Sequence, residues 1–451
     1  MIMDLKTIIS GVNVLNTIGN LDLNITNIHS DSRKIKQDGL FVAINGFSQN
    51  GTKFIPNAIE NGAIAILVEP DVNIANINFP NVAIISVNNT RQALAISACN
   101  FYDNPSKKLN LIGVTGTKGK TTTTFMLKSI LEAHKLSVGL IGSIAVYIND
   151  EKIEDTDRTT PESIDIQKYL ALMVERKVQV AIIEVSSQAM KLDRVTGSEF
   201  EIGVFTNFSE DHISPNEHPT MEDYFNSKLE LLKMSKFGVI NNDDNEVSKI
   251  KSLLPNKIIK TFGIENEADV KADHENTIIS DSYVKFPVSM PGGTGLPVGT
   301  VLVADVSPLA DITVPIPGKF SVYNALGAIT ASLFFDVTSD EIKAGLKDLR
   351  VLGRSELVPN KLGLTILIDY AHTPSSLESI LTAVKTYAKG KVICAWGVGG
   401  NRDSAKRPVM GEISGRLADF TILMTDQARY EDPLKILKDI EIRNYSYWKT
   451  I

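Results

Sequence analysis

GVTGTKGKTTTT, residues 113–124, is the stretch of sequence that decides the fold. An apolar run typical of a buried strand precedes it, and a helical pattern that extends to about Lys135 follows it. Backbone N–H groups in a tight glycine turn converge on an anion, and the N-terminal end of the next helix adds positive potential. Gly116 and Gly119 permit such a turn. The stretch therefore predicts a phosphate-binding loop between a strand and a helix.

Two side chains of this loop indicate which phosphates it holds. Lys120 can reach the terminal phosphates of a nucleotide as a point charge, and the Thr121 hydroxyl can ligate a bridging magnesium ion. The spacing departs from the standard G-x-x-x-x-G-K-[ST] pattern, because Val114 stands at its first glycine position. The alternative is a glycine-rich turn with an incidental lysine. The strand before the loop and the helix after it favour phosphate binding.

Composition limits the class of protein. The chain has 451 residues, 43% of them hydrophobic and 22% charged, which is typical of a globular protein of two to four domains. A net charge of -7 and the lack of a long basic block argue against nucleic acid or an anionic membrane as the main partner. Two cysteines, Cys99 and Cys394, are too few for a disulfide framework. With no signal-peptide pattern at the N-terminus and no run long enough to span a bilayer, we expect a cytoplasmic protein.

The pattern along the chain predicts three α/β segments. Residues 1–106 alternate short β-rich runs with helical patterns, and residues 102–108 are typical of a linker. Residues 107–350 alternate strands and helices, which predicts a parallel, doubly wound sheet, whereas the proline- and glycine-rich stretch 286–300 predicts an irregular excursion or hairpins. A third α/β segment occupies residues 351–451.

Polar residues at further strand ends predict a metal site. Glu184 ends a buried run, Asp211 and His212 follow the next strand, and Lys228 lies on a predicted helix. Ligands of an open parallel sheet gather at the carboxyl ends of its strands. A glutamate and a histidine there can hold magnesium through an oxygen and an imidazole. Singly, each is more often a capping or hydrogen-bonding residue, but together with the phosphate loop they favour a metal.

Nine stretches of the chain together resemble the Mur ligase family, most closely the branch that adds the third residue of the peptidoglycan stem peptide. They occur in the family's order over nearly the whole chain, and the combination is far more specific than any one piece. They are residues 29–51, 113–124, 159–163, 184–195, 205–228, 316–329, 351–358, 368–374 and 399–413.

The resemblance implies a three-domain architecture and an activity. Residues 1–106 would bind the UDP-muramoyl substrate, residues 107–350 would form the P-loop domain that binds ATP, and residues 351–451 would form a shortened, Rossmann-like domain for the amino acid. The implied enzyme is an ATP- and Mg²⁺-dependent ligase that joins a diamino acid to UDP-N-acetylmuramoyl-L-alanyl-D-glutamate in peptidoglycan biosynthesis. We expect a monomer with no nucleic-acid or membrane partner.

The resemblance also implies roles for individual residues. ATP would be held by Gly116, Thr117, Lys118, Gly119, Lys120, Thr121, Thr122, Asn324, Arg354, Asp369 and His372. The UDP-muramoyl dipeptide would be held by Ser30, Ser32, Phe47, Ser48, Gln49, Thr159, Thr160, Ser186 and Arg194. The diamino acid would be held by Arg402, Asp426, Gln427, Ala428 and Arg429. The metal ligands would be Thr121, Glu184, His212 and Lys228 as its carbamate, and the catalytic residues Lys120, Glu184, His212 and Lys228.

The implied reaction needs these groups. A carboxylate does not react with an amine at neutral pH, because its leaving group is too poor. Attack of the substrate carboxylate on the γ-phosphate of ATP gives an acyl phosphate, while magnesium and Lys120 neutralise charge that would repel the attacking anion. The amine then displaces phosphate. Because water competes for this intermediate, we expect the site to close by movement of the third domain.

Departures from the family pattern bear on the substrate. Lys118 and Gln188 stand where many relatives have asparagine and histidine, and we interpret them as markers of one branch. Residues 425–433 replace the Asp-Asn-Pro-Arg of diaminopimelate-adding members but keep Asp426 and Arg429. A guanidinium can bind the distal carboxylate of meso-diaminopimelate, which lysine lacks, so we favour diaminopimelate over L-lysine. The alternative is that Arg429 only pairs with a neighbouring Glu431 or Asp432.

The end of the chain, residues 439–451, reads unlike the family, whose members continue further. Either the sequence is truncated or frameshifted, or part of the third domain is lost, and we expect an exposed sheet edge, lower stability and a damaged amino-acid site. A pseudo-ligase that binds nucleotide without turnover is therefore the main alternative. A folylpolyglutamate synthetase is a further alternative, but it should lack the uridine-domain signature SDSR found here at residues 30–33. The hypothesis of a P-loop kinase or GTPase would leave the presence of Glu184, His212 and Lys228 unexplained.

Overall fold

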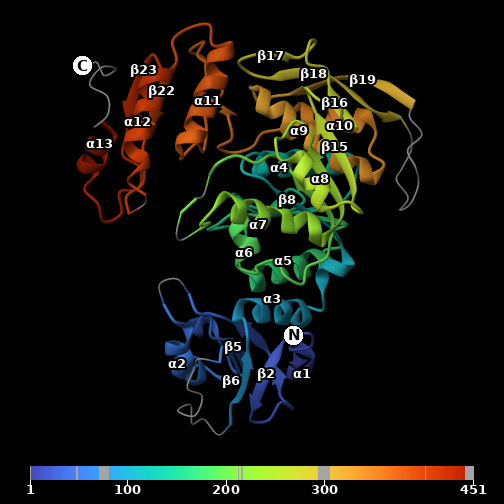
Figure 1. Ribbon diagram of the computed structural model, residues 1–451, viewed down its shortest axis with the longest axis vertical. Coiled ribbons are helices and arrows are strands. Elements are labelled where there is room, and N and C mark those ends of the chain that lie inside the picture. The colour runs from blue at the N-terminus through green and yellow to red at the C-terminus, as the bar shows by residue number, and fades with distance from the viewer. Residues whose placement is uncertain are drawn as a thin grey trace.

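The computed structural model describes residues 2–46, 49–70, 81–211, 213–214, 217–292, 305–401 and 403–441. They form three α/β units stacked along the long axis of the molecule, with the N-terminal unit at the bottom of Figure 1 and the C-terminal unit at the top. The three-part α/β fold predicted from the sequence is confirmed. The domain boundaries at 106/107 and 350/351 stay predictions.

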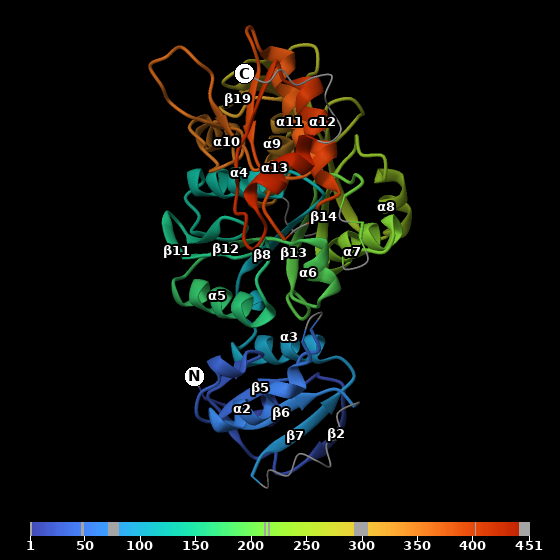
Figure 2. The ribbon, with the colours of Figure 1, turned by 90° about the vertical axis from the view of Figure 1, so that its left-hand side faces the viewer.

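The N-terminal unit is built on a five-stranded sheet with the order β2-β7-β6-β5-β4. Strands β4 to β7 are parallel, and β2 runs antiparallel at one edge. Helix α3 packs against α5 of the central unit and joins the two units (Figure 2). The bounds are β1 (Met3–Asp4), α1 (Leu5–Ile8), β2 (Val14–Ile18), β3 (Asn24–Ile25), β4 (Asn27–His29), β5 (Gly39–Val42), α2 (Ile55–Glu60), β6 (Ala63–Val68), β7 (Ala83–Val87) and α3 (Thr90–Phe101).

Seven parallel strands, in the order β9-β12-β8-β13-β14-β15-β16, form the middle of the central sheet. In this register Glu184 at the end of β12 lies opposite Val114 of β8, and Phe205 at the end of β13 lies opposite Thr115. Three neighbouring strands thus end level with the start of the phosphate loop. The bounds are β8 (Asn110–Thr115), β9 (Val138–Ile141), β12 (Val180–Glu184), β13 (Phe200–Phe205), β14 (Ser235–Asn241), β15 (Ile258–Gly263) and β16 (Val270–Ala272).

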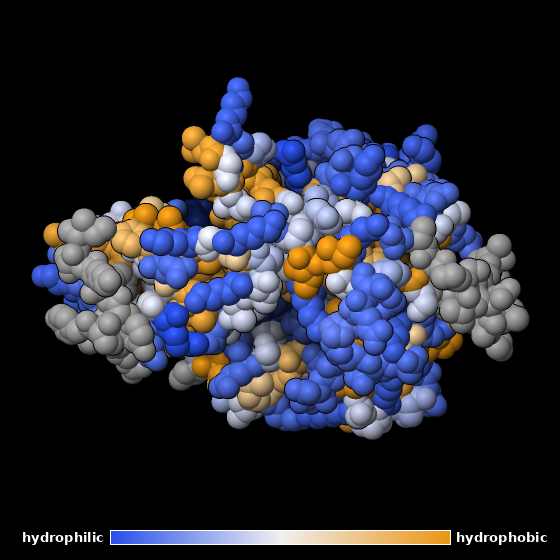
Figure 3. All heavy atoms as spheres, turned by 90° about the horizontal axis from the view of Figure 1, so that it is seen from above, coloured by the Kyte–Doolittle hydropathy of each residue, from blue (hydrophilic) through white to orange (hydrophobic). Residues whose placement is uncertain are grey.

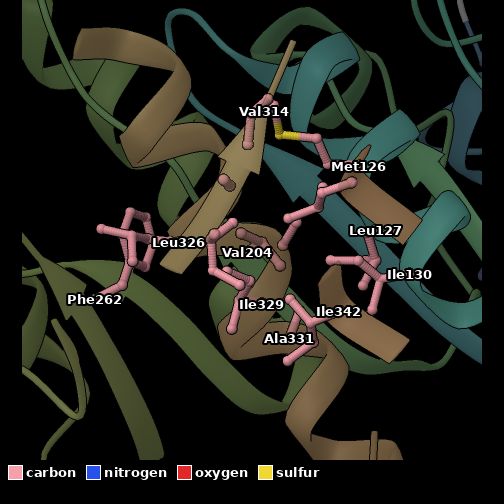
Figure 4. Packing of buried hydrophobic residues seen from close by; sticks show 14 of the residues in the cluster. Met126, Leu127, Ile130, Val204, Phe262, Val314, Leu326, Ile329, Ala331 and Ile342 are labelled. Carbon is pink, nitrogen blue, oxygen red and sulfur yellow. The ribbon is translucent and has the colours of Figure 1, made fainter. Parts of the chain in front are cut away.

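Helices cover both faces of this sheet. Helices α4, α9 and α10 pack on one face, where their apolar side chains meet those of the strands (Figure 4). Helices α5 and α7 contribute to a second core on the other face. The bounds are α4 (Lys120–Ala133), α5 (Ser163–Glu175), α6 (Ser187–Lys191), α7 (Met221–Met234), α8 (Val247–Leu253), α9 (Lys319–Ser332) and α10 (Ser339–Lys347). Burial on both faces explains why the strands are nearly continuous apolar runs.

The prediction of a parallel sheet was incomplete, because antiparallel strands extend it at both edges. β10 (Ala145–Ile148) and β11 (Glu151–Asp155) form a hairpin at one edge, and β17 (Ile278–Ile279), β18 (Val284–Gly292) and β19 (Asp305–Val314) lie at the other. Stretch 286–300 therefore starts in β18, which pairs antiparallel with β19 as in a hairpin and has a register irregularity between Phe286 and Val288. Buried and less buried side chains alternate over residues 284–289, as in a half-buried strand. Residues 293–300 lie outside the described residues.

The C-terminal unit places a parallel pair of strands against three helices. One face of that pair is poorly covered, since Ile393 is 62% exposed, Phe420 39% and Ile422 43%. Figure 3, seen from above, shows apolar residues at the surface of this part of the molecule. The lower stability expected from the sequence stays a prediction. The bounds are β20 (Glu356–Leu357), β21 (Leu367–Ile368), α11 (Pro374–Tyr387), β22 (Ile393–Trp396), α12 (Lys406–Leu417), β23 (Phe420–Leu423) and α13 (Pro433–Glu441).

Across residues 2–46, 49–70, 81–211, 213–214, 217–292, 305–401 and 403–441, no helix combines the length and apolarity needed to cross a bilayer.

Close contact between α4 and α10 predicts the effect of one substitution. A Cβ atom at Gly345 would lie 2.6 Å from Cα of Ile130 and 2.8 Å from the carbonyl oxygen of Ser129. We expect Gly345→Val to lower the free energy of unfolding by about 1–3 kcal/mol, because backbone atoms of α4 cannot move aside. Urea denaturation measures it. Ala344→Val adds the same side chain at an exposed position of α10 and should change stability by well under ~1 kcal/mol. Equal effects of the two variants would contradict the packing described.

Candidate active site

The loop between β8 and α4 needs glycine at two positions. Gly116 has φ of 143° and Gly119 has φ of 85°, in the region that favours glycine. A Cβ at Gly116 would lie 2.0 Å from Oγ1 of Thr206, and one at Gly119 would lie 2.2 Å from Oδ1 of Asn324. The loop is therefore pressed against the end of β13 on one side and against α9 on the other.

Asn207, which we did not predict from the sequence, braces this loop. Its carbonyl oxygen accepts from the backbone N–H of Thr117 at 2.9 Å, and its Oδ1 accepts from that of Lys118 at 2.9 Å. Its Nδ2 donates to the carbonyl oxygen of Lys118 at 3.0 Å. The signal available in the sequence was a polar amide two residues beyond a buried strand.

Two lysine ammonium groups converge on one carbonyl of the loop. Nζ of Lys120 donates to the carbonyl oxygen of Gly116 at 2.9 Å, and Nζ of Lys228 donates to the same oxygen at 2.8 Å. Burial lowers the pKa of Lys120, and it holds the pKa of Lys228 well below its usual range, where the nearby Lys120 charge adds to the effect. The positive charge gathered here favours the binding of phosphate. The same charge, together with burial, disfavours protonation of Lys228.

Glu184 is fully buried beside the loop. It accepts from the Thr121 hydroxyl at 2.8 Å, from the backbone N–H of Ser143 at 2.8 Å and from the Ser143 hydroxyl at 3.0 Å. Arg354 of the C-terminal segment donates to Oγ1 of Thr121 at 3.3 Å. We did not predict Ser143, although it lies two residues beyond the end of another central strand, β9.

Some of the side chains at this site are suitable ligands for a hard cation such as Mg²⁺. The Thr121 hydroxyl and the Glu184 carboxylate are oxygen ligands of the type that Mg²⁺ prefers, and they are within 2.8 Å of each other. An ammonium on Lys228 cannot ligate a cation, whereas a carbamate could. His212 lies outside the described residues, and the residues that are described contain no group of three or more His, Cys, Asp and Glu side chains suited to a metal.

A cavity of about 720 Å³ opens at the phosphate loop, a volume typical of a small-molecule site. It lies between the central and C-terminal units. Asp369 accepts from the backbone N–H groups of Ser355 at 2.8 Å and Ala371 at 2.9 Å, and the Arg354 guanidinium lies 4.5 Å from the Tyr370 ring centre. All residues expected to hold ATP line the cavity except Gly116, which belongs to the same loop: Thr117, Lys118, Gly119, Lys120, Thr121, Thr122, Asn324, Arg354, Asp369 and His372.

Four residues expected to hold the muramoyl dipeptide surround the end of β12. Thr160 donates to the carbonyl oxygen of Glu184 at 2.8 Å and accepts from the backbone N–H of Ser186 at 3.0 Å. Arg194 donates to the carbonyl oxygen of Thr160 at 3.1 Å, and Oγ1 of Thr159 lies within hydrogen-bond distance of Oγ of Ser143, at 3.1 Å. The structure thus brings these four next to Glu184.

The residues expected to hold the uridine nucleotide lie apart from this cavity, in the N-terminal unit. Ser32 donates to Oδ1 of Asn57 at 2.8 Å, and Gln49 closes a turn by accepting from the backbone N–H of Gly46 at 2.9 Å. Ser30 is half-buried beside Ser32 in the same unit. The predictions for Phe47 and Ser48 lie outside the described residues.

The residues expected to hold the diamino acid follow β23. They are Asp426, Gln427, Ala428 and Arg429, and none of them lines the cavity. The carbonyl oxygen of Gln427 accepts from the backbone N–H of Gly400 at 2.9 Å, and Arg429 is exposed with φ of 54°. Arg402 lies outside the described residues.

The suggested pairing of Arg429 with Glu431 or Asp432 is not found among the described residues. Glu431 instead binds the buried Arg407, whose Nη1 and Nη2 donate to it at 2.9 and 3.0 Å, and Arg407 also binds Asp439 at 2.8 Å. Arg407 therefore ties the segment after β23 to α12 and α13.

The geometry of the loop predicts the result of a glycine substitution. We expect Gly119→Ala to weaken ADP binding at least tenfold, because its methyl group would collide with Asn324 as well as strain the backbone. Isothermal titration with ADP and Mg²⁺ measures it. Gly363→Ala carries a similar backbone strain, at φ of 70°, but meets nothing within 4 Å and should leave ADP affinity within twofold. Equal losses would show that strain alone, and not the Asn324 contact, shapes the site.

Family models and individual relatives agree on what this chain resembles. The Mur ligase middle domain matches residues 114–332, the Mur ligase glutamate ligase domain matches residues 353–451, and the Mur ligase family catalytic domain matches residues 24–102. A relative from Clostridium acetobutylicum, named UDP-N-acetylmuramoyl-L-alanyl-D-glutamate–2,6-diaminopimelate ligase 1, is 41% identical over 441 residues, which are 97% of this chain and 86% of the relative.

Solved structures show the same fold. A structure of a UDP-N-acetylmuramoyl-L-alanyl-D-glutamate–2,6-diaminopimelate ligase has a TM-score of 0.71 at 24% identity and covers 98% of this chain and 86% of its own. A MurF ligase from Thermotoga maritima in complex with ADP has a TM-score of 0.58 at 18% identity and covers 93% of this chain and 92% of its own. The phosphate loop, the surrounding strand ends and these similarities lead to one conclusion: the chain belongs to the Mur ligase family.

Proposed function

We propose that this protein is an ATP-dependent ligase that joins meso-diaminopimelate to UDP-N-acetylmuramoyl-L-alanyl-D-glutamate in peptidoglycan biosynthesis. The observation that carries the proposal is the convergence of Lys120, Thr121, Glu184 and Lys228 at the carboxyl ends of the middle strands of the central sheet, in a chain 41% identical to a relative with that name. ATP use is further supported by the ADP bound to the MurF ligase of similar fold.

Each residue has a defined part in such a reaction. The backbone N–H groups of the loop and the N-terminal end of α4 bind the phosphates. Lys120, released from the Gly116 carbonyl, offsets the charge that accumulates as the substrate carboxylate attacks the γ-phosphate. Thr121 and Glu184 would hold Mg²⁺, which supplies further neutralisation of the phosphate charge when bound.

Thr159, Thr160, Ser186 and Arg194 would hold the dipeptide so that its free carboxylate faces the γ-phosphate. Thr160 contacts Glu184, and Thr159 contacts Ser143. Ser186 and Arg194 contact Thr160, so all four lie near the carboxyl end of β12. Fixing the two reactants in this way replaces a bimolecular encounter with an intramolecular step.

Lys228 would act as a carbamate. Burial holds its pKa well below the usual range and so favours loss of its proton, after which the amine nitrogen can form a bond with the carbon of CO₂ and release one further proton, giving an anion. That anion removes the ammonium charge now bound to the Gly116 carbonyl and provides an oxygen ligand. His212 would complete the ligand set.

The diamino acid would reach the acyl phosphate only after the C-terminal unit moves. Asp426 and Arg429 do not line the cavity, although Arg354, Asp369 and His372 of the same unit do. We therefore propose a closing rotation about residues 351–355, which excludes water from the intermediate. The protein would act as a monomer in the cytoplasm.

Phosphate release tests the proposed reaction. We expect ATP to be converted to ADP and inorganic phosphate only when UDP-N-acetylmuramoyl-L-alanyl-D-glutamate and meso-diaminopimelate are both present, with one tripeptide product formed per phosphate. L-Lysine should replace diaminopimelate poorly. Phosphate release that stays at the background rate with either amino acid would contradict the proposed ligase activity. A higher rate with L-lysine than with diaminopimelate would contradict the proposed substrate.

Arg429 should set the preference for diaminopimelate. We expect Arg429→Ala to raise KM for meso-diaminopimelate about tenfold or more, since a charge-assisted hydrogen bond contributes about 1.5–3 kcal/mol. KM for ATP should stay within twofold. Arg416→Ala removes a surface arginine of the same unit that pairs with Glu378 and should leave both constants unchanged. An unchanged KM for diaminopimelate in Arg429→Ala would exclude Arg429 as its ligand.

A further inference from the structure

The loop between β13 and α7 ends in a buried histidine that the proposed reaction does not use. The His218 side chain is 1% exposed, and both ring nitrogens have partners. Nδ1 lies 2.7 Å from Oδ2 of Asp223 in the first turn of α7, and Nε2 lies 2.9 Å from Oγ of Ser187 at the start of α6. We call these three residues the Ser187–His218–Asp223 relay.

The direction of each hydrogen bond follows from charge. Asp223 also accepts from Nζ of Lys191 at 2.9 Å, and hydrogen bonds from Lys191 and His218 keep its pKa below the ordinary value despite burial, which acts to raise it. As a carboxylate it can only accept, so Nδ1 of His218 donates. Burial lowers the pKa of His218 against the opposing effect of Asp223, so the ring is neutral at pH 7 and its Nε2 accepts from Ser187.

The relay is not a hydrolytic site. None of its three residues lines the cavity, and Ser187 is 5% exposed, so its hydroxyl cannot reach a substrate there. A buried chain of satisfied polar groups instead fixes the geometry of the elements that it joins. Here these elements are α6, which directly follows the dipeptide-binding Ser186, and α7.

Helix α7 connects the relay to the phosphate loop through side-chain contacts. The His218 ring lies 5.0 Å from the ring of Tyr224, which is fully buried and next to Asp223 in the chain. The Tyr224 hydroxyl donates to Oγ1 of Thr117 at 3.2 Å. One turn further, Nζ of Lys228 lies 4.4 Å from the Tyr224 ring centre and binds the Gly116 carbonyl. A change in the tilt of α7 would therefore move both contacts with the loop.

We propose that His218 is a positioning residue of the ligase reaction, held by Ser187 and Asp223 so that α7 presents Tyr224 and Lys228 to the phosphate loop. The inference rests on the proposed function, because it assigns the relay an effect on turnover at that site. It predicts that breaking the relay lowers kcat while leaving nucleotide binding largely intact.

Substitutions at both ends of one hydrogen bond test this. His218→Phe keeps a flat ring against Tyr224 but removes both hydrogen bonds, and we expect kcat to fall at least tenfold while KM for ATP changes less than threefold. Ser187→Ala should lower kcat in the same direction. Ser187→Thr keeps a hydroxyl and should restore kcat to within twofold of the unchanged protein, which a general loss of packing would not allow.

A matched control and a second readout complete the test. Glu222→Gln removes a neighbouring carboxylate of α7 that is exposed and pairs only with Lys249 among the ion pairs described, and kcat should not change. Amide hydrogen exchange should rise at residues 224–228 in His218→Phe and Ser187→Ala, but not in Ser187→Thr.

The possible results separate the inference from the proposed function. Unchanged exchange in α7, or kcat within twofold in both His218→Phe and Ser187→Ala, would overturn the role of His218. Equal loss of kcat in Ser187→Ala and Ser187→Thr would also overturn it. If the unsubstituted chain releases no phosphate with its substrates, the proposed function fails, and hydrogen exchange still decides whether the relay positions α7.

Discussion

The level ends of three parallel strands are the constraint on which the rest of the site depends. β8 lies between β12 and β13, so Glu184 is fixed one residue from the phosphate loop, and the backbone after β13 presses against Gly116. This register is set by the packing of buried apolar side chains on both faces of the sheet, because a shift of one residue would exchange the two faces of a strand and disrupt that packing. Polar groups at these ends are thus held together by the core and not by their own contacts.

The electrostatics of the site follow from this arrangement. Two ammonium groups, those of Lys120 and Lys228, share the Gly116 carbonyl, and a buried carboxylate, Glu184, is balanced by hydroxyl and amide donors. Such a site is preorganised for an anion that carries several charges and for a cation that bridges it. Turnover then depends on residues that keep α7 in place, which gives the Ser187–His218–Asp223 relay a part in the reaction although none of its residues lines the cavity.

The sequence was sufficient for the central strands, the phosphate loop and the alternation of elements, because apolar runs and glycine turns are local signals. It did not predict Ser143, Asn207, or the link from Arg407 to Glu431. Those features join segments far apart in the chain, and no local pattern marks them: Ser187 and His218 are 31 residues apart, and the chain between them gives no sign that they meet. The alternative pairing of Arg429 with Glu431 or Asp432 is not found among the described residues, because Glu431 binds Arg407, which lies 24 residues away in the chain.

The central claim is that a triphosphate on residues 116–121 lies within metal-bridging reach of Glu184. A crystal structure with Mg²⁺, a non-hydrolysable ATP analogue and UDP-N-acetylmuramoyl-L-alanyl-D-glutamate measures this most directly. We expect the γ-phosphate on the loop N–H groups, and a Mg²⁺ ion bound by the Thr121 hydroxyl and a Glu184 oxygen at about 2.0–2.1 Å. A nucleotide bound elsewhere, or a metal ion that leaves Glu184 bound only to Thr121 and Ser143, would contradict the account.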